Sequence, residues 1–303
     1  MKFAPVAIFV YNRRHYLEMT VKSLAANREA KETELFIYSD GWKGEKDKPA
    51  VLDVREYLRT ISGFKSVTII EAEKNRGLGK SIIHGVTEMV NNHGEVIVLE
   101  DDLQLSPWFL KFMNDGLNTY RDCEKVVSIH GYLYPVKATL PESFFLRGAD
   151  CLGWATWSRA WNLLDTNAEF LYTEILKRKE MDLFNFYGAA FKERILERVI
   201  AGENDSWAVR WDASAFLNEK LTLYPGKSLV HHLGSDGEGT NTKKTTKLDV
   251  VLSSDPITVT KIAQEHSQTA WFEIGKFYLS IKAYNPFKRL KFYLKSKNLI
   301  PLR

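Results

Sequence analysis

The most informative stretch of the sequence runs Glu95-Val96-Ile97-Val98-Leu99-Glu100-Asp101-Asp102-Leu103. Its apolar residues, 96–99, indicate a short strand buried on both faces, as in a parallel sheet. In such sheets, ligands bind at the carboxyl ends of the strands, where this chain places three consecutive carboxylates. Adjacent carboxylates repel one another, so we expect a divalent cation, bridging to phosphate oxygens, to offset the repulsion. The alternative is a solvated acidic turn before a helix, with Ser106 as its N-cap.

Strand and helix patterns alternate through the first hundred residues. Apolar runs predict strands at 5–11, 35–38, 67–70 and 96–99, and helical spacing predicts helices over 16–26, 51–61 and 80–91. This alternation predicts an α/β fold with a mainly parallel sheet and helices on both faces. The second half is less regular: it predicts strands at 126–130, 144–147 and 221–224, a charged helical stretch over 168–200, and a loop over 225–246.

Each of the four predicted strands of the first half ends in polar residues. These are Asn12 with Arg13, Asp40, Asn75 with Arg76, and Glu100 with Asp101 and Asp102. The carboxyl ends of parallel strands meet at one edge, so we expect a single pocket holding basic and acidic groups. We expect Asp102 to bind the metal directly, and Asp101 and Glu100 to face a sugar or a ribose.

Arginines and one further aspartate complete the predicted pocket. Arg13 and Arg76 can form charge-assisted hydrogen bonds to a diphosphate. Asp40 can accept a hydrogen bond from a nucleobase or a ribose hydroxyl, although a turn aspartate before Gly41 is the alternative. The nearby Gly77-Leu78-Gly79-Lys80-Ser81 resembles the end of a P-loop, but the glycine that the pattern needs five residues before Gly79 is Lys74. We therefore do not expect a P-loop.

A candidate catalytic carboxylate lies in the second half. Asp205 follows Glu203-Asn204 and precedes Trp207 and Trp211. An aromatic wall would raise the pKa of this carboxyl group, which suits a general base. The alternatives are that Asp205 is the N-cap of a helix over 206–218, and that Asp212 is the base.

Tryptophans and histidines supply further candidates. Trp154, in a segment that we predict to be a loop, can form a platform for the apolar face of a sugar, although core packing with Trp157 and Trp161 is the alternative. His231 and His232 are candidates for a metal ligand or a diphosphate contact, against a purely structural role.

Taken in order, these motifs resemble the glycosyltransferase A (GT-A) fold over roughly residues 5–235. The segments that carry the resemblance are Tyr-Asn-Arg at 11–13, Ser-Asp-Gly at 39–41, Asn-Arg-Gly-Leu-Gly at 75–79 and Glu-Asp-Asp-Leu at 100–103. The last of these, with Gly153-Trp154 and Asn204-Asp205-Ser206-Trp207, is similar to N-acetylglucosaminyltransferase I. Asp205 and Arg210 also resemble the acid and the following arginine of family 2 glycosyltransferases, although those enzymes have Glu-Asp where this chain has Asn204-Asp205.

The resemblance implies an inverting transfer from a nucleoside diphosphate sugar, which we expect to be a UDP sugar, to a glycan or glycolipid acceptor. It implies that Asp102 binds Mn²⁺ or Mg²⁺, that Arg13 and Asp40 hold the nucleotide, and that Asp205 deprotonates the acceptor hydroxyl. It also implies a GT-A domain over 1–250, with a nucleotide-sugar half (1–105) and an acceptor half (106–250). A nucleotidyltransferase usually carries a glycine-rich loop after the first strand, which residues 11–15 lack. A non-catalytic nucleotide-sugar or carbohydrate-binding protein is the second alternative.

Composition limits the setting. The 303 residues, 45% of them hydrophobic, can form a full core, and two cysteines fit a reducing compartment. The start of the chain shows no apolar leader, so we expect a cytoplasmic protein. The resemblance then implies an enzyme of bacterial surface polysaccharide synthesis rather than an enzyme of the secretory pathway. Residues 276–303 carry eight Lys or Arg and no acidic residue, and the remaining 34 basic and 38 acidic residues give a net charge of −4. This uneven charge argues against a nucleic-acid partner. The aromatic and basic extension over 251–303 suggests contact with an anionic membrane surface, against a solvated basic helix.

Overall fold

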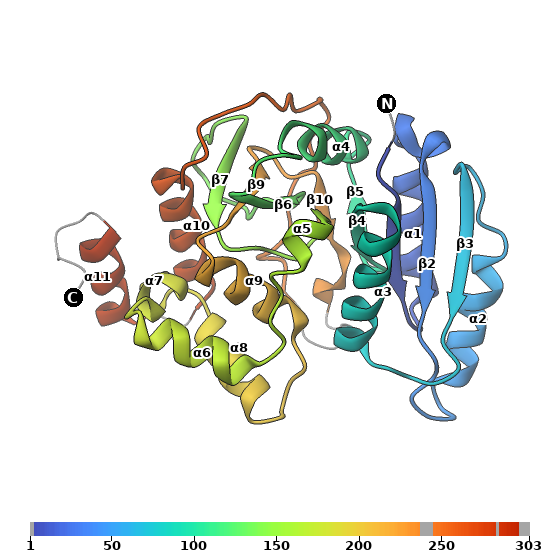
Figure 1. The fold of residues 1–303 in the computed structure, drawn as a ribbon, viewed down its shortest axis with the longest axis horizontal. Helices are drawn as coiled ribbons and strands as arrows, with labels where there is room; N and C mark the ends of the chain where they lie inside the picture. Colours follow the sequence, from blue (N-terminus) through green and yellow to red (C-terminus); the bar gives the residue numbers. More distant parts are fainter. Residues whose placement is uncertain (1–2, 237–244, 283–284, 297–303) are drawn as a thin grey trace.

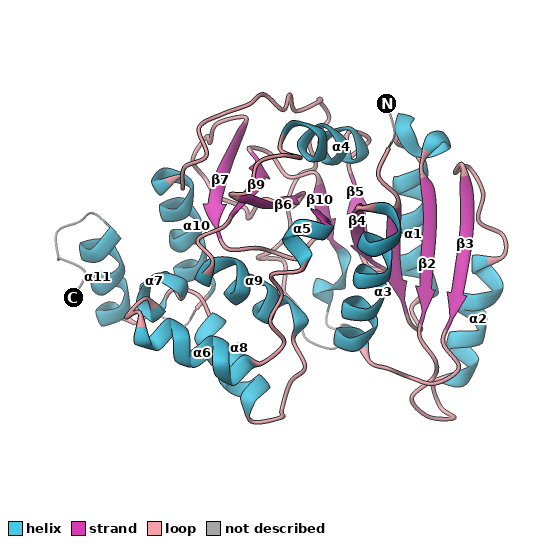
Figure 2. Ribbon diagram, viewed as in Figure 1, coloured by secondary structure: helices cyan, strands magenta, loops and turns pink. Residues whose placement is uncertain are grey.

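The first hundred residues form the parallel half of a central sheet (Figures 1 and 2). The structure is a computed structural model that describes residues 3–236, 245–282 and 285–296. The strands of this half are β1 (Val6–Val10), β2 (Glu34–Ser39), β3 (Ser66–Glu71) and β4 (Glu95–Glu100), and its helices are α1 (Arg14–Ala25), α2 (Lys48–Leu58) and α3 (Leu78–His93). Each overlaps the range that hydrophobic periodicity predicts for it.

The order of the strands determines where a ligand can bind. The main sheet runs β3-β2-β1-β4-β8-β6-β9-β7, and β3, β2, β1 and β4 are mutually parallel. The chain moves outward from β1 to β3 and then returns to the other side of β1. Right-handed crossovers therefore place α1 and α2 on one face and α3 on the other, as Figure 2 shows. The switch point between β1 and β4 is where such sheets bind ligands. The predicted α/β fold with helices on both faces is confirmed.

The second half extends the sheet in mixed orientation. Its strands are β5 (Leu103–Leu105), β6 (Val126–His130), β7 (Ser143–Arg147), β8 (Trp154–Trp157), β9 (Leu221–Pro225) and β10 (Val230–His232). Its helices are α4 (Phe109–Thr119), α5 (Ser158–Trp161), α6 (Ala168–Lys177), α7 (Met181–Phe184), α8 (Lys192–Ile200), α9 (Trp207–Leu217), α10 (Gln268–Ile281) and α11 (Pro286–Ser296). β8 pairs antiparallel with both β4 and β6, and so joins the two halves.

Two predictions for this half were wrong. The segment around Trp154 is strand β8, because its backbone pairs between β4 and β6. The predicted helical stretch over 168–200 is divided into α6, α7 and α8. Lys179, Phe186 and Tyr187 adopt positive φ angles of 58°, 50° and 49°, which a continuous right-handed helix does not allow.

A small second sheet brings residue 232 to the acidic turn. β5 pairs antiparallel with β10, so that His232 lies opposite Leu103. The backbone N–H of Leu233 donates to the carbonyl of Asp102 at 2.8 Å. The predicted loop over 225–246 thus contains strand β10, while residues 237–244 lie outside the described residues.

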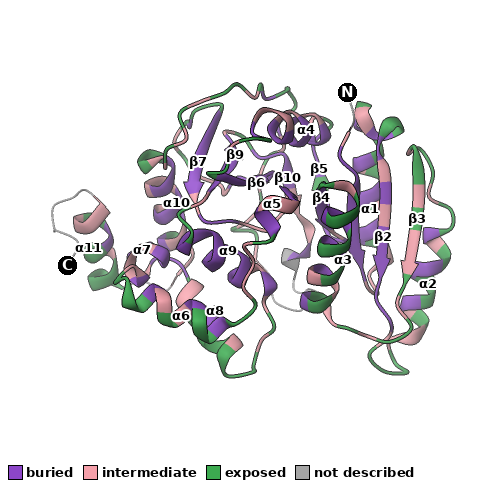
Figure 3. Cartoon of the chain, viewed as in Figure 1, coloured by how far each residue is buried: buried purple, intermediate pink, exposed green. Residues whose placement is uncertain are grey.

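The hydrophobic core is continuous across both halves. Figure 3 shows β1 buried along its length, whereas β3, at the edge of the sheet, carries exposed residues. One core cluster extends from β1 through Trp154 and Trp211 to β9, so the two halves share their interior. Trp154 and Trp211 are among the largest fully buried side chains.

The C-terminal segment packs against the second half through aromatic residues. Trp271 of α10 is buried and stacks on Phe186, with ring centroids 4.9 Å apart. Phe292 of α11 is fully buried against Trp271 and Phe272. In the part of the chain that the structure describes, no helix has the length and apolar character needed to cross a membrane.

Candidate active site

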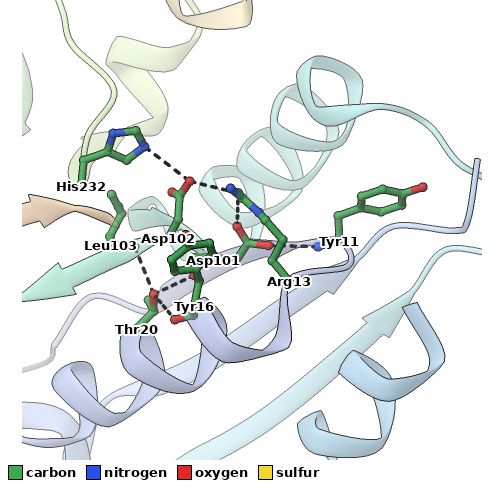
Figure 4. A network of polar contacts seen from close by, with 8 residues as sticks. All are labelled: Tyr11, Arg13, Tyr16, Thr20, Asp101, Asp102, Leu103 and His232. Carbon is green, nitrogen blue, oxygen red and sulfur yellow. Dashed lines mark hydrogen bonds and ion pairs between the residues drawn. The ribbon is translucent and has the colours of Figure 1, made fainter. Parts of the chain in front are cut away.

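Arg13 binds the acidic turn at the switch point (Figure 4). β4 ends at Glu100, and the following turn places Asp101 and Asp102 beside the end of β1. Arg13 Nη2 lies 2.6 Å from Asp101 Oδ1 and 3.0 Å from Asp102 Oδ2. The backbone N–H of Tyr11 donates to Asp101 Oδ2 at 3.3 Å. Arg13, the N-cap of α1 just beyond the end of β1, therefore offsets much of the repulsion between these two carboxylates.

Thr20 of α1 fixes the backbone of this turn through two hydrogen bonds. The sequence does not predict this role. Thr20 Oγ1 donates to the carbonyl of Asp101 at 2.8 Å and accepts the N–H of Leu103 at 3.1 Å. A threonine within a predicted helix gives no sequence signal for such a role, because the contact joins residues more than eighty positions apart.

The three acidic groups differ in how strongly they hold a proton. Burial raises the pKa of Glu100 to about 8, and the charges of Asp102 and Asp101 add to the effect. Burial also raises the pKa of Asp101 to about 6, although the charge of Arg13 opposes it. For Asp102 the effect of burial is outweighed by His232 and Arg13, and its pKa is lowered. Asp102 is thus the carboxylate most firmly held in its charged form.

Asp102 and His232 form the candidate metal pair. His232 Nε2 lies 3.4 Å from Asp102 Oδ2, whereas His231 Nδ1 lies 3.0 Å from the carbonyl of Val250. A Cβ at Gly234 would lie 2.4 Å from Asp102 Oδ2 and 3.0 Å from His232 Nε2, so only glycine allows the chain to pass this close. Within the described residues, no group of three or more His, Cys, Asp or Glu is arranged to hold a metal. One carboxylate and one imidazole fit a divalent cation that takes its remaining ligands from phosphate and water.

The strand ends line one cleft, as the alternation of elements predicted. The cleft has a volume of about 480 Å³ and joins the carboxyl ends of β1, β2 and β4 to the loop before α3. Its lining includes Asn12, Arg13, Tyr38, Asp40, Lys43, Asn75, Gly77, Glu100 and Asp101. Arg76 is exposed and instead lines a smaller neighbouring hollow.

Asp40 organises the loop between β3 and α3. Its Oδ1 accepts the N–H groups of Gly41 and Arg76 at 2.9 and 2.8 Å. Its Oδ2 accepts the N–H of Gly77 at 2.9 Å and Asn75 Nδ2 at 3.1 Å. With both oxygens engaged in these bonds, the carboxylate shapes one wall of the cleft rather than pointing free acceptors at a nucleotide.

Asp205 lies at the N-terminus of α3, facing the nucleotide half. A Cβ at Gly79 would lie 2.5 Å from the carbonyl oxygen of Asp205 and 2.8 Å from its Oδ2. Arg210 Nη2 binds Asp205 Oδ1 at 2.6 Å, and the Asp205 side chain is 53% exposed. The N-cap of α9 is Ser206, whose hydroxyl accepts the N–H of Val209, so Asp205 does not have that role.

The predicted tryptophan wall around Asp205 is wrong. Trp207 and Trp211 are buried, and they pack against Trp154 at centroid distances of 5.4 and 6.1 Å. Trp154 itself has no exposed surface, so it cannot stack on a sugar, and the alternative of core packing applies. The aromatic residues near Asp205 in the sequence lie in the core because nearly the whole of α9 is buried.

Asp212, the alternative base, already uses both carboxylate oxygens in contacts within the protein. It is only 5% exposed, its Oδ2 lies 2.7 Å from Lys192 Nζ, and its Oδ1 accepts the N–H of Ala149 at 3.0 Å. Burial raises the pKa of Asp212, and the charge of Lys192 opposes part of that shift. Its contacts are those of a group that positions the chain around residue 149.

Comparison with known families decides the enzyme class. Residues 6–132 match the model of the glycosyl transferase family 2. This match confirms the prediction of a glycosyltransferase that uses a nucleotide sugar, and it covers the cleft and the acidic turn. A search of curated proteins finds no match. The resemblance to N-acetylglucosaminyltransferase I stays a prediction.

Similar solved structures are distant from this chain. Staphylococcus aureus TarS aligns with 14% identity and a TM-score of 0.40, over 99% of this chain and 53% of its own. The mannosyltransferase PcManGT from Pyrobaculum calidifontis, in complex with GDP-Man and Mn²⁺, aligns with 11% identity and a TM-score of 0.37, over 71% and 68%. Glucosyl-3-phosphoglycerate synthase from Mycobacterium tuberculosis, with Mn²⁺, UDP and glucosyl-3-phosphoglycerate, aligns with 11% identity and a TM-score of 0.33, over 55% and 59%. Likenesses of this size carry no conclusion about substrate.

Proposed function

We propose that this protein is a metal-dependent, inverting glycosyltransferase that moves a sugar from a UDP sugar to a hydroxyl of a glycan or glycolipid, as in bacterial surface polysaccharide synthesis. The observation that carries this proposal is the position of Asp205. Because α3 starts beyond the carboxyl end of β3, its contact with Gly79 brings Asp205 to the end of the sheet where Asp101 and Asp102 lie.

The donor binds in the cleft at the strand ends. Asp102 and His232 would hold Mn²⁺ or Mg²⁺, which when bound offsets the charge of the leaving diphosphate. Arg13 Nη1 is buried and, among the described residues, has no hydrogen-bond partner, so it has a donor left for a phosphate oxygen. Glu100 and Asp101 line the same cleft and face the ribose and the donor sugar.

Asp205 acts as the general base. Its carboxylate takes the proton of the acceptor hydroxyl while the oxygen attacks the anomeric carbon of the donor. The new carbon–oxygen bond forms on the face opposite the breaking bond to the diphosphate, so the configuration inverts. Arg210 fixes the orientation of Asp205 through the contact at 2.6 Å.

A panel of nucleotide sugars tests the proposal. Purified protein with Mn²⁺ is incubated with UDP, GDP and dTDP sugars, and release of the nucleoside diphosphate is measured. We expect turnover with a UDP sugar, and we expect Asp205→Asn to retain UDP binding while losing at least about 100-fold in rate. Release of pyrophosphate from a nucleoside triphosphate would instead identify a nucleotidyltransferase. Binding of UDP with the same turnover in wild type and Asp205→Asn would refute the role of Asp205, and binding without turnover would indicate a non-catalytic protein.

We also propose that α11 touches an anionic membrane surface. Phe287, Leu290 and Tyr293 are exposed by 82%, 57% and 39%, and they recur at helical spacing on the side away from buried Phe292. Basic residues of the same helix flank this apolar stripe, a combination that suits anionic lipid. Residues 297–303, which complete the predicted basic tail, lie outside the described residues.

A further inference from the structure

A second cavity lies in the acceptor half, next to the segment that carries Asp205. Its volume is about 180 Å³, and its lining includes Ser206 and Ala208, which follow Asp205 in the chain. The walls are aromatic and polar at once, with Tyr134, Phe186, Tyr224, Tyr278 and Asp150 among the lining residues. Asp212, the alternative base named from the sequence, also lines this cavity.

Asp150 is the centre of the polar wall. Its Oδ2 accepts the hydroxyls of Tyr134 at 2.8 Å and Tyr224 at 3.3 Å, and its Oδ1 accepts the N–H of Cys151 at 2.9 Å. The side chain is 19% exposed. A carboxylate offers about four acceptor sites, and the thiol of Cys151, a weak donor, bonds Asp150 in addition to these three groups. A stronger donor such as a sugar hydroxyl would therefore take the place of the thiol.

The other charges of the cavity are already paired, and the charge of Asp150 is not. Lys192 binds Asp212 at 2.7 Å, and Arg147 binds Glu180 at 2.8 Å through both of its terminal nitrogens. Within the described residues, no Lys or Arg forms an ion pair with Asp150. His130 Nε2 lies 3.9 Å from Asp150 Oδ1, and burial lowers the pKa of His130, which favours its neutral form.

The loop that carries Asp150 is fixed by Asp212 of α9. Asp212 accepts the N–H of Ala149, and a Cβ at Gly148, where φ is +102°, would lie 2.3 Å from Asp212 Oδ1. Burial, with the charge of Asp150, raises the pKa of the Cys151 thiol well above the usual range.

We propose that this cavity is the acceptor site and that it binds a neutral, hydroxylated sugar ring, with a ring hydroxyl donating to Asp150. The inference rests on the proposed glycosyltransferase function. Aromatic walls with a few fixed polar groups suit a ring that is apolar on its faces and hydroxylated at its edge. The uncompensated carboxylate disfavours an acceptor group that carries phosphate or carboxylate, since like charges repel at short range.

Saturation-transfer NMR tests this proposal without turnover. Full-length protein with UDP and Mn²⁺ is titrated with methyl glycosides of glucose, galactose, mannose and N-acetylglucosamine, and with glucuronate and glucosamine. We expect at least one neutral methyl glycoside to bind. Asp150→Asn should weaken its binding about tenfold or more, and Tyr134→Phe about three- to tenfold.

Tyr120→Phe is the matched control. It also removes the hydroxyl of a buried tyrosine, one that bonds the carbonyl of Thr260 outside the cavity, and it should leave sugar binding unchanged. The proposal is overturned if no neutral glycoside binds, if glucuronate or glucosamine binds instead, or if Asp150→Asn and Tyr134→Phe, folded by circular dichroism, bind as wild type does. UDP binding, measured on the same samples, separates the two proposals: its absence counts against the donor site, whereas sugar binding reports on this cavity alone.

Discussion

Replacing Gly79 with alanine is expected to slow sugar transfer while leaving nucleotide binding nearly unchanged. The added Cβ would lie 2.5 Å from the carbonyl oxygen of Asp205 and 2.8 Å from its Oδ2, so the segment around Asp205 must move by about 0.5–1 Å to restore ordinary contact. A misplacement of about 1 Å can cost about 100-fold in rate. We expect kcat to fall by about 10- to 100-fold.

The effect on stability is expected to be small by comparison. Alanine in place of glycine inside a helix stabilises by about 1 kcal/mol, and overpacking costs about 1–3 kcal/mol. The free energy of unfolding should therefore fall by no more than about 2 kcal/mol, a change that thermal unfolding by circular dichroism can resolve.

The assay compares kcat, and the affinity for UDP with Mn²⁺, between the variant and a matched control. Gly44→Ala makes the same substitution in an exposed loop, where no atom lies within 4 Å of the new Cβ, and it should behave as wild type does. If Gly79→Ala turns over as fast as Gly44→Ala, then Asp205 is not the base or does not need this position. If instead UDP binding is lost, the substitution has disturbed the donor cleft, and the proposed division between the two halves is wrong.

Three further predictions concern other parts of the molecule. His232→Ala should weaken Mn²⁺ binding in the presence of UDP by about 10- to 100-fold, measured by electron paramagnetic resonance. The reason is that Asp102 loses its only close imidazole among the described residues. An unchanged Mn²⁺ affinity would show that Asp102 and His232 do not bind the metal as a pair. Burial, with the charges of Arg147 and Lys192, lowers the pKa of His266 from 6.5 to about 4. The contribution of neutral His266 to the free energy of unfolding is therefore fully present above pH 6.5, and about 1–3 kcal/mol of it is lost as the pH falls from 6.5 to 4. His266→Gln should make the midpoint of thermal unfolding depend less steeply on pH over that range. An equally steep dependence in the variant would contradict the lowered pKa of His266. Phe287→Ser should reduce flotation with vesicles of equimolar phosphatidylglycerol and phosphatidylcholine, whereas equal flotation of wild type and variant would remove the membrane proposal.

The parallel half could be predicted from the sequence because its signals are local. Each strand is an apolar run of four to seven residues, and each is followed within a short distance by a helix with one apolar face. The edge where ligands bind follows from that order alone, since parallel strands end together. For this reason Arg13, Asp40, Glu100 and Asp101 line one cleft, as expected.

The second half of the chain could not be predicted in the same way because its contacts are between distant residues. Strand β8 is defined by pairing with β4 and β6, and its four residues carry no strand pattern of their own. The sequence points to Asp205 through the tryptophans beside it and through the resemblance that also includes Arg210. In the structure Asp205 contacts Arg210 and Gly79 rather than those tryptophans. Asp150 gave no signal at all, because the tyrosines that bind it come from positions 134 and 224.

The two terminal nitrogens of Arg13 differ in what they bind, and this difference bears on how the donor site works. The sequence predicts that a divalent cation offsets the repulsion among three adjacent carboxylates, whereas in the structure Arg13 binds Asp101 and Asp102 through a single nitrogen, Nη2. Its other terminal nitrogen, Nη1, is buried without a partner among the described residues. A diphosphate in the cleft would give Nη1 an acceptor and draw the guanidinium away from Asp102, just as that carboxylate is needed by a cation. Nucleotide and metal would then bind more tightly together than either does alone, because each relieves a charge that the other leaves uncompensated.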